Sequence, residues 1–172
     1  RPEDVIEGWD ARRSAADSFL LHIGNNGFYK NRLGVVRIFD RIRKLMPVRL
    51  VLAGPAPDAA MKSLIRERGI EELVEFVCDP DDSKIIGLYR RSRLLLFPSL
   101  YEGFGWPPLE AMAWGCPVVC SRQGSLPEVV GKAALTADAD NEAELAAHCV
   151  SILKDRGVAD GLVAAGRARL AE

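Results

Sequence analysis

The stretch RLLLFPSLYEGFGWPPLEAMAWGCPVVCS, residues 93–121, contains the structural unit that repeats along the chain. It begins with a continuous apolar run at 93–98 and ends with another at 117–121. Apolar runs without polar alternation are typical of strands that are buried on both faces of a sheet. Between the runs, Pro107 and Pro108 favour the first turn of a helix, where the missing N–H of proline costs nothing. The stretch therefore predicts a strand, a loop, a helix and a second strand.

The same alternation continues through the rest of the chain. In 30–46 the apolar residues recur at the i, i+3, i+4, i+7 spacing of a helix, and Pro47 ends the pattern. Ser125 with Glu128, and Asn141 with Glu144, have the capping-box pattern of a helix start. The predicted strands are 18–24, 48–54, 73–77, 93–98, 117–121 and 133–137, and the predicted helices are 30–46, 58–68, 82–91, 125–131, 142–155 and 157–171.

Strands that alternate with helices predict an α/β fold, namely a Rossmann-like open parallel sheet with helices on both faces. The 172 residues suit one domain, which we expect at 18–172, with 1–17 as a linker or interdomain segment. Ligands of such sheets bind outside the carboxyl ends of the strands. The loops after residues 24, 54, 78 and 98 are therefore the place to look for a site.

Composition excludes several classes of protein. The formal net charge is −1 and no basic stripe is interleaved with aromatic residues, so we expect no nucleic-acid partner. Four cysteines match no zinc spacing, because Cys116 and Cys120 are four apart without a nearby histidine. We expect all four to be small buried hydrophobes, which fits a reducing compartment. No apolar run of about 20 residues and no signal-peptide pattern is present, which predicts a cytoplasmic protein.

Two loops carry the chemistry. In HIGNNGFYKN (22–31), Gly24 and Gly27 allow close approach of the backbone to a ligand, and Lys30 could reach a phosphate. The alternative is a surface turn with a solvated lysine. Farther along, Glu102 and Glu110 flank a Gly-Phe-Gly turn whose backbone donors could hold a diphosphate or sugar hydroxyls.

Glu110, expected in the first helical turn, could accept hydrogen bonds from two ribose hydroxyls, with Glu102 at the other end of the ligand. Alternatively, Glu110 complements the helix dipole and Glu102 is solvated. These residues alone leave both interpretations open. Other motifs are absent: the turn lacks the third glycine of a dinucleotide fingerprint, and the chain has no P-loop, zinc-protease motif or nucleophile elbow.

The segment FPSLYEGFGWPPLEAMAWGCPVVCSRQGSLPEVVGKAAL (97–135) closely resembles the signature of the retaining glycosyltransferases of family 4, which have the GT-B fold. Its E-x7-E element runs from Glu102 to Glu110. The blocks HIGNNGFYKN, LVLAGPAP and LVEFVCDPDDSKIIGLYRRSRLLLFPS resemble the preceding blocks of the same domain, in the same order. The resemblance covers about residues 18–155.

The resemblance implies that this chain is the C-terminal half of a GT-B enzyme, which binds a nucleotide-sugar donor. An N-terminal acceptor domain of the same full-length chain would then be absent, so this domain alone would be inactive. The expected reaction transfers a sugar with retention, from a donor such as GDP-mannose, in bacterial polysaccharide or glycolipid assembly. The family needs no metal or other cofactor, and association of the full enzyme with the inner face of a membrane is left open.

The resemblance also implies roles for individual residues. Glu102 would be catalytic and would hold the transferred sugar, Lys30 would neutralise the diphosphate, and Glu110 would bind the ribose hydroxyls. The remaining donor-binding residues are Gly24 and Asn25, the backbone around Cys78, and the amides of Phe104, Gly105 and Trp106.

One departure from the family pattern concerns charge. Many members have an arginine soon after the glycine that corresponds to Gly24, but here Asn25 and Asn26 stand there. Another cation would complete the clamp, or phosphate binding would be weaker. The alternatives to a transferase are another GT-B enzyme, such as a nucleotide-sugar epimerase or a phosphorylase, and a non-catalytic nucleotide-binding or interaction module.

Overall fold

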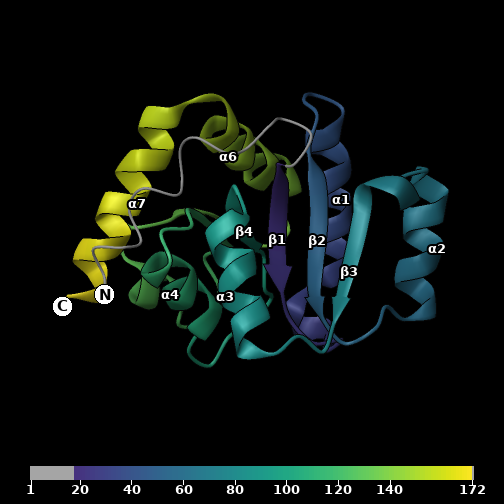
Figure 1. Ribbon diagram of the computed structural model, residues 1–172, viewed down its shortest axis with the longest axis horizontal. Coiled ribbons are helices and arrows are strands. Elements are labelled where there is room, and N and C mark those ends of the chain that lie inside the picture. The colour runs from purple at the N-terminus through teal and green to yellow at the C-terminus, as the bar shows by residue number, and fades with distance from the viewer. Residues whose placement is uncertain (1–17, 172) are drawn as a thin grey trace.

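The computed structural model describes residues 18–171, so the linker predicted at 1–17 lies outside the described residues. One sheet of six strands forms the centre, in the order β3-β2-β1-β4-β5-β6, and every neighbouring pair is parallel (Figure 1). The strands agree with the predicted ones to within two residues at each end. They are β1 (Phe19–Ile23), β2 (Arg49–Gly54), β3 (Val74–Cys78), β4 (Leu94–Phe97), β5 (Val118–Ser121) and β6 (Leu135–Ala137).

Helices connect the strands and cover both faces of the sheet. Alternate residues of a strand point to opposite faces, and in β1 the side chain of Leu20 joins one apolar core while that of Leu21 joins the other. The first core is completed by α1 (Arg32–Arg43), α2 (Ala59–Arg68) and α6 (Glu142–Lys154), and the second by α3 (Asp82–Arg91), α4 (Trp106–Ala113) and α5 (Leu126–Val130). The predicted Rossmann-like α/β architecture is confirmed.

The last helix, α7 (Arg156–Leu170), links the two layers (Figure 1). Its first half places Ala159 and Leu162 in the core that contains α6. Its second half packs on α4 so closely that a Cβ added at Gly166 would lie 2.9 Å from Cγ of Met112. Among residues 18–171, no helix combines the length and the apolar character needed to cross a bilayer.

Two helix ends follow the sequence pattern and one does not. Gly69 ends α2 with φ 60°, and the Asn141 side chain accepts a hydrogen bond from the Glu144 N–H at the start of α6. The capping box predicted at Ser125 is wrong. Ser125 already has helical backbone angles and its side chain makes no cap, because its hydroxyl is used elsewhere.

The prediction that all four cysteines are buried is also only partly right. Cys116, Cys120 and Cys149 are buried, and burial raises the pKa of the Cys120 thiol to about 12. Cys78 is exposed, because it is the last residue of β3 and β3 lies at the edge of the sheet.

Candidate functional site

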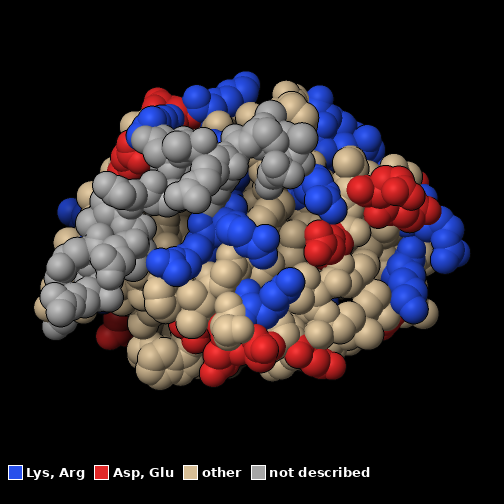
Figure 2. All heavy atoms as spheres, in the orientation of Figure 1, with Lys and Arg blue, Asp and Glu red and all other residues tan. Residues whose placement is uncertain are grey.

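The candidate site lies where the strand order reverses, between β1 and β4. From this point the chain winds outward through β2 and β3 on one side and through β5 and β6 on the other. In open α/β sheets this reversal leaves a crevice at the carboxyl ends of the two central strands. These ends point to the lower edge of Figure 1, where Figure 2 shows several acidic side chains gathered.

The loops that follow β1 and β4 are joined to each other across this point. The Leu100 N–H donates to the Tyr29 carbonyl at 2.7 Å, and the side-chain amide of Asn31 donates to the Pro98 carbonyl at 2.9 Å. Lys30 ends a short 3-10 helix, η3 (Phe28–Lys30), and Asn31 has a left-handed backbone with φ 53° that turns the chain into α1. Lys30 is therefore held at the edge of the second loop.

Lys30 and Glu102 form a largely buried ion pair at the point where the strand order reverses. Nζ of Lys30 lies 2.6 Å from Oε1 of Glu102, and the two side chains are 14% and 9% exposed. The ammonium also lies 5.1 Å from the centre of the Phe97 ring and 5.4 Å from that of Tyr29. Each charge has lost most of its water, so each depends on the other. The structure thus brings together the two side chains to which the resemblance assigns the diphosphate and the transferred sugar.

The segment before α5 packs against the loop that carries Glu102 and supports it. The Ser125 hydroxyl lies within hydrogen-bonding distance of the Glu102 carbonyl, at 3.1 Å, and of the Phe104 carbonyl, at 2.8 Å. Gly124, with φ 59°, packs against Glu102, and a Cβ there would lie 2.5 Å from the Glu102 carbonyl oxygen. Sequence reasoning missed this support, because it assigned Ser125 to a helix cap.

An aromatic pair lies beside Glu102 at the start of α4. The rings of Phe104 and Trp106 are 4.6 Å apart, and the two residues are 45% and 63% exposed. Gly105 between them has φ 94°, and a Cβ there would lie 2.6 Å from Cδ2 of Leu126. Pro107 and Pro108 have no N–H, so the free backbone donors at the start of α4 are those of Gly105 and Trp106, which have no partner within the helix. The loop therefore presents backbone donors next to an exposed aromatic surface.

Glu110 is not in the first turn of its helix, contrary to the prediction. The helix α4 begins at Trp106, after the left-handed Gly105, so Glu110 lies one turn farther in. A role as partner of the helix dipole is therefore not supported, since that interaction fades within the first turn. Glu110 is exposed, and its Oε2 accepts a hydrogen bond of 2.9 Å from the Tyr89 hydroxyl.

Tyr89 comes from α3 and is 1% exposed. Burial, together with the neighbouring charge of Glu110, raises the pKa of its hydroxyl, which stays protonated and able to donate. The same oxygen lies 3.3 Å from the Pro107 carbonyl. Sequence reasoning did not single out Tyr89, because it reads as one more residue on the buried face of a helix.

The remaining predicted residues lie toward β2 and β3. The Gly24 N–H donates to the Ala53 carbonyl at 3.1 Å, and Gly54 packs against the Gly24 carbonyl so closely that no side chain would fit there. The Asn25 side chain bonds within its own loop, to the Gly27 N–H and the Tyr29 hydroxyl. Asn25 thus shapes the loop. Cys78 is exposed at the end of β3, the edge strand on this side of the sheet.

A second cation lies close to Lys30 in the sequence and was missed. Arg32, in the first turn of α1, is 4% exposed and donates from Nη1 to Asn26 Oδ1 and, at 3.2 Å, to the Pro55 carbonyl. Burial lowers the pKa of its guanidinium, while the charges of Asp58 and Cys78 raise it. Within the pattern of a long amphipathic helix, no local signal marked this arginine as special.

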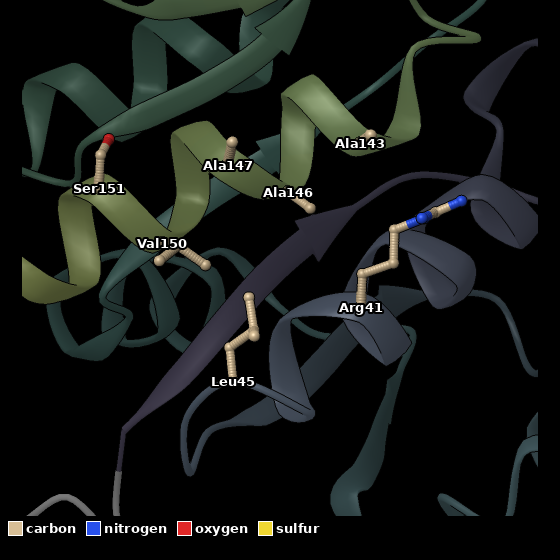
Figure 3. Close-up of a pocket in the computed structure, with 7 residues that line it drawn as sticks. All are labelled: Arg41, Leu45, Ala143, Ala146, Ala147, Val150 and Ser151. Carbon is tan, nitrogen blue, oxygen red and sulfur yellow. The ribbon is translucent and has the colours of Figure 1, made fainter.

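A hollow elsewhere in the molecule contains none of these residues. It has a volume of about 410 Å³, lies between α1 and α6, and is lined mostly by apolar side chains such as Leu45, Ala146 and Val150 (Figure 3).

Comparisons with known proteins show the family and the fold. The sequence model of the family described as "Glycosyl transferases group 1" matches residues 9–169. The chain is 36% identical over 159 residues to O-antigen chain mannosyltransferase B of Escherichia coli, covering 90% of this chain and 42% of that protein. It is 54% identical over 135 residues to the serotype-specific mannosyltransferase WbdA of Escherichia coli, covering 73% of this chain and 16% of that protein.

A solved structure has the same fold. The C-terminal domain of the glycosyl transferase group 1 family protein LpcC from Francisella tularensis matches with a TM-score of 0.81 at 17% identity, covering 97% of this chain and 95% of that one. By contrast, the chain spans less than half the length of the two curated mannosyltransferases.

Proposed function

The chain belongs to the family Glycosyl transferases group 1, and from that premise we propose that it is the C-terminal, donor-binding domain of a family 4 enzyme with the GT-B fold. It would hold a nucleoside-diphosphate sugar, while an acceptor domain elsewhere in the full-length protein holds the acceptor. Two observations support this division: the short span of the match to the curated relatives, and a C-terminal domain of the same fold that was solved alone.

The observation that carries the proposal is the Lys30–Glu102 pair at the point where the strand order reverses. An ammonium has three N–H donors, and a carboxylate has two acceptor oxygens. One contact between Lys30 and Glu102 therefore leaves donors for a diphosphate on one side and an acceptor for a sugar hydroxyl on the other. Glu110, fixed by Tyr89, would accept hydrogen bonds from the ribose hydroxyls.

In the proposed reaction, the bond between the anomeric carbon and the diphosphate oxygen breaks. A bond from the same carbon to the acceptor oxygen forms on the same face, so the configuration is retained. The acceptor hydroxyl gives its proton to the leaving phosphate. Lys30 would stabilise the charge that develops on that phosphate, which is the interaction an enzyme must strengthen in the transition state.

The names of the relatives suggest the biological setting. One makes the O-antigen chain and both transfer mannose, so we propose a mannosyltransferase of polysaccharide assembly, with GDP-mannose as donor.

Titration calorimetry of the 172-residue chain with GDP, UDP and ADP tests the proposal. We expect at least one nucleoside diphosphate to bind, and Lys30→Met to weaken that binding without changing the fold seen by circular dichroism. The chain alone should transfer no sugar. Failure of all three nucleotides to bind at millimolar concentration would contradict the proposal.

A further inference from the structure

The guanidinium of Arg32 is buried, and within residues 18–171 only one of its three nitrogens is hydrogen-bonded. Nη1 contacts Asn26 Oδ1 and the Pro55 carbonyl, whereas Nε and Nη2 have no partner among these residues and no exposed surface. Buried donors almost always have partners, because an unpaired one carries the full cost of its lost hydration. A pair of such donors on one charged group points to a ligand that accepts hydrogen bonds from both.

The position of Arg32 indicates which part of a ligand it would meet. It lies at the junction of the loops that follow β1 and β2, which it contacts through Asn26 and the Pro55 carbonyl. Lys30 is two residues earlier in the chain but faces β4 and Glu102. Lys30 thus lies at the strand reversal, whereas Arg32 lies on the side of β2.

The neighbouring carboxylate does not fill the role of partner. Asp58 caps α2, where its Oδ1 accepts a hydrogen bond of 2.8 Å from the Met61 N–H. On the solvent side, the exposed Asn26 bonds through Nδ2 to the Ala56 carbonyl at 3.0 Å and so bridges the two loops. Nε and Nη2 of Arg32 have no exposed surface, so a ligand would reach them by displacing this bridge, which is one exposed hydrogen bond.

The two unpaired nitrogens are adjacent on one edge of the guanidinium. Nε–H and one Nη2–H point the same way and form a fork that suits two neighbouring acceptors. Guanine presents such a pair, O6 and N7, and an arginine that binds both is the commonest specific contact to that base. Adenine offers an acceptor at N7 but a donor at N6, and uracil has no two adjacent acceptors on one edge.

We infer that Arg32 selects a guanine nucleotide as donor, by donating Nε–H and Nη2–H to O6 and N7 of the base. This inference rests on the proposed function, because it assigns the base to the same donor site. It names Arg32 as the residue that determines base specificity, while Lys30 and Glu102 serve the reaction of any nucleotide-sugar.

Calorimetry of the unmodified chain with base analogues tests the inference without a mutation. GDP and IDP keep both O6 and N7, whereas 7-deaza-GDP lacks N7, and ADP and UDP lack the pair. We expect GDP and IDP to bind roughly tenfold or more tightly than 7-deaza-GDP, ADP and UDP, from the worth of a bidentate arginine–base contact.

The variant Arg32→Lys tests the residue itself, since lysine keeps the charge but has no fork. We expect GDP to lose at least a factor of ten in affinity and UDP to change less than threefold, so that the preference for guanine disappears. Arg37→Lys is the matched control, because Arg37 lies on the same helix but bonds to Glu142 of α6. It should leave every affinity unchanged.

The outcomes distinguish a failure of the proposed function from a failure of base selection by Arg32. If no nucleotide binds, the proposed function fails. If nucleotides bind but GDP and 7-deaza-GDP do so equally, or if Arg32→Lys weakens all of them alike, base selection by Arg32 is wrong and the donor site remains.

Discussion

Lys30 and Glu102 are 72 positions apart in the sequence, and their charged atoms lie 2.6 Å apart in the structure. The pair joins the loop after β1 to the loop after β4. The pair should therefore contribute both to the free energy of unfolding and to nucleotide binding, and the two contributions can be separated by experiment.

Lys30→Met should leave the Glu102 carboxylate buried without a partner. The free energy of unfolding should fall by about 3–5 kcal/mol, the usual cost of breaking a buried pair from one side. Adding Glu102→Gln should restore most of this stability but none of the nucleotide affinity. Urea unfolding and calorimetry on the single and double variants would check both expectations. A double variant as unstable as Lys30→Met alone would contradict the ion-pair explanation.

Tyr89→Phe removes the hydroxyl that fixes Glu110 and keeps the buried ring. We expect the dissociation constant of a nucleoside diphosphate to rise roughly fivefold, which corresponds to about 1 kcal/mol for one hydrogen bond. With the 2′,3′-dideoxy analogue the same variant should have no effect, because the ribose hydroxyls are gone. An equal loss for both ligands would indicate a general structural role for Tyr89.

Gly124→Ala should be more costly than Gly69→Ala. Both glycines have a left-handed backbone, with φ 59° and 60°, but the space around Gly69 is open, whereas a Cβ at Gly124 meets the Glu102 carbonyl. We expect about 1 kcal/mol of destabilisation at Gly69 and a further 1–3 kcal/mol, roughly, at Gly124. Only the variant at Gly124 should also weaken binding of a nucleotide-sugar. Equal effects at the two positions in thermal unfolding would contradict the packing argument.

His22 should make the fold sensitive to acid. It is fully buried at the end of β1, with Nδ1 donating to the Leu96 carbonyl, and burial lowers its pKa from 6.5 to about 4. The unfolded chain therefore binds a proton before the folded chain does, so stability is complete above pH 6.5 and is lost as the pH falls toward 4. The loss should reach about 3 kcal/mol.

His22→Asn provides the comparison, since its amide can still donate to Leu96 but does not titrate. Urea unfolding at pH 7.5 and pH 4.5 should show a smaller loss for the variant than for the unmodified chain. The same pH dependence in both would rule out His22 as its source.

The sheet, and the loops at the carboxyl ends of its strands, were predictable from the sequence because they depend on local patterns. Short, mostly apolar runs marked the six strands, and Pro107 with Pro108 marked the start of α4. The position of Glu110 within that helix was predicted wrongly, because the left-handed Gly105 sets the first helical residue at Trp106. The backbone conformation of Gly105 therefore decides where α4 begins, and with it whether Glu110 is close enough to the helix end to interact with the dipole.

The residues that were missed act through partners far away in the sequence. Tyr89 and Glu110 are 21 positions apart, and Arg32 and Pro55 are 23 apart. Ser125 has the spacing of a helix cap, yet its hydroxyl bonds to carbonyls of the loop after β4. A hydroxyl or a guanidinium has several possible partners, and only the folded chain decides between them.

Trp106 gives the candidate site its own optical signal. Its indole is 63% exposed and lies against Phe104 at the loop that would receive the sugar, whereas Trp114, the other tryptophan within residues 18–171, is half-buried next to Arg90. A sugar seated on that loop would shield the indole at 106 from a soluble quencher such as acrylamide. Occupancy could then be followed through intrinsic fluorescence, in an unlabelled protein and at concentrations far below those that calorimetry needs.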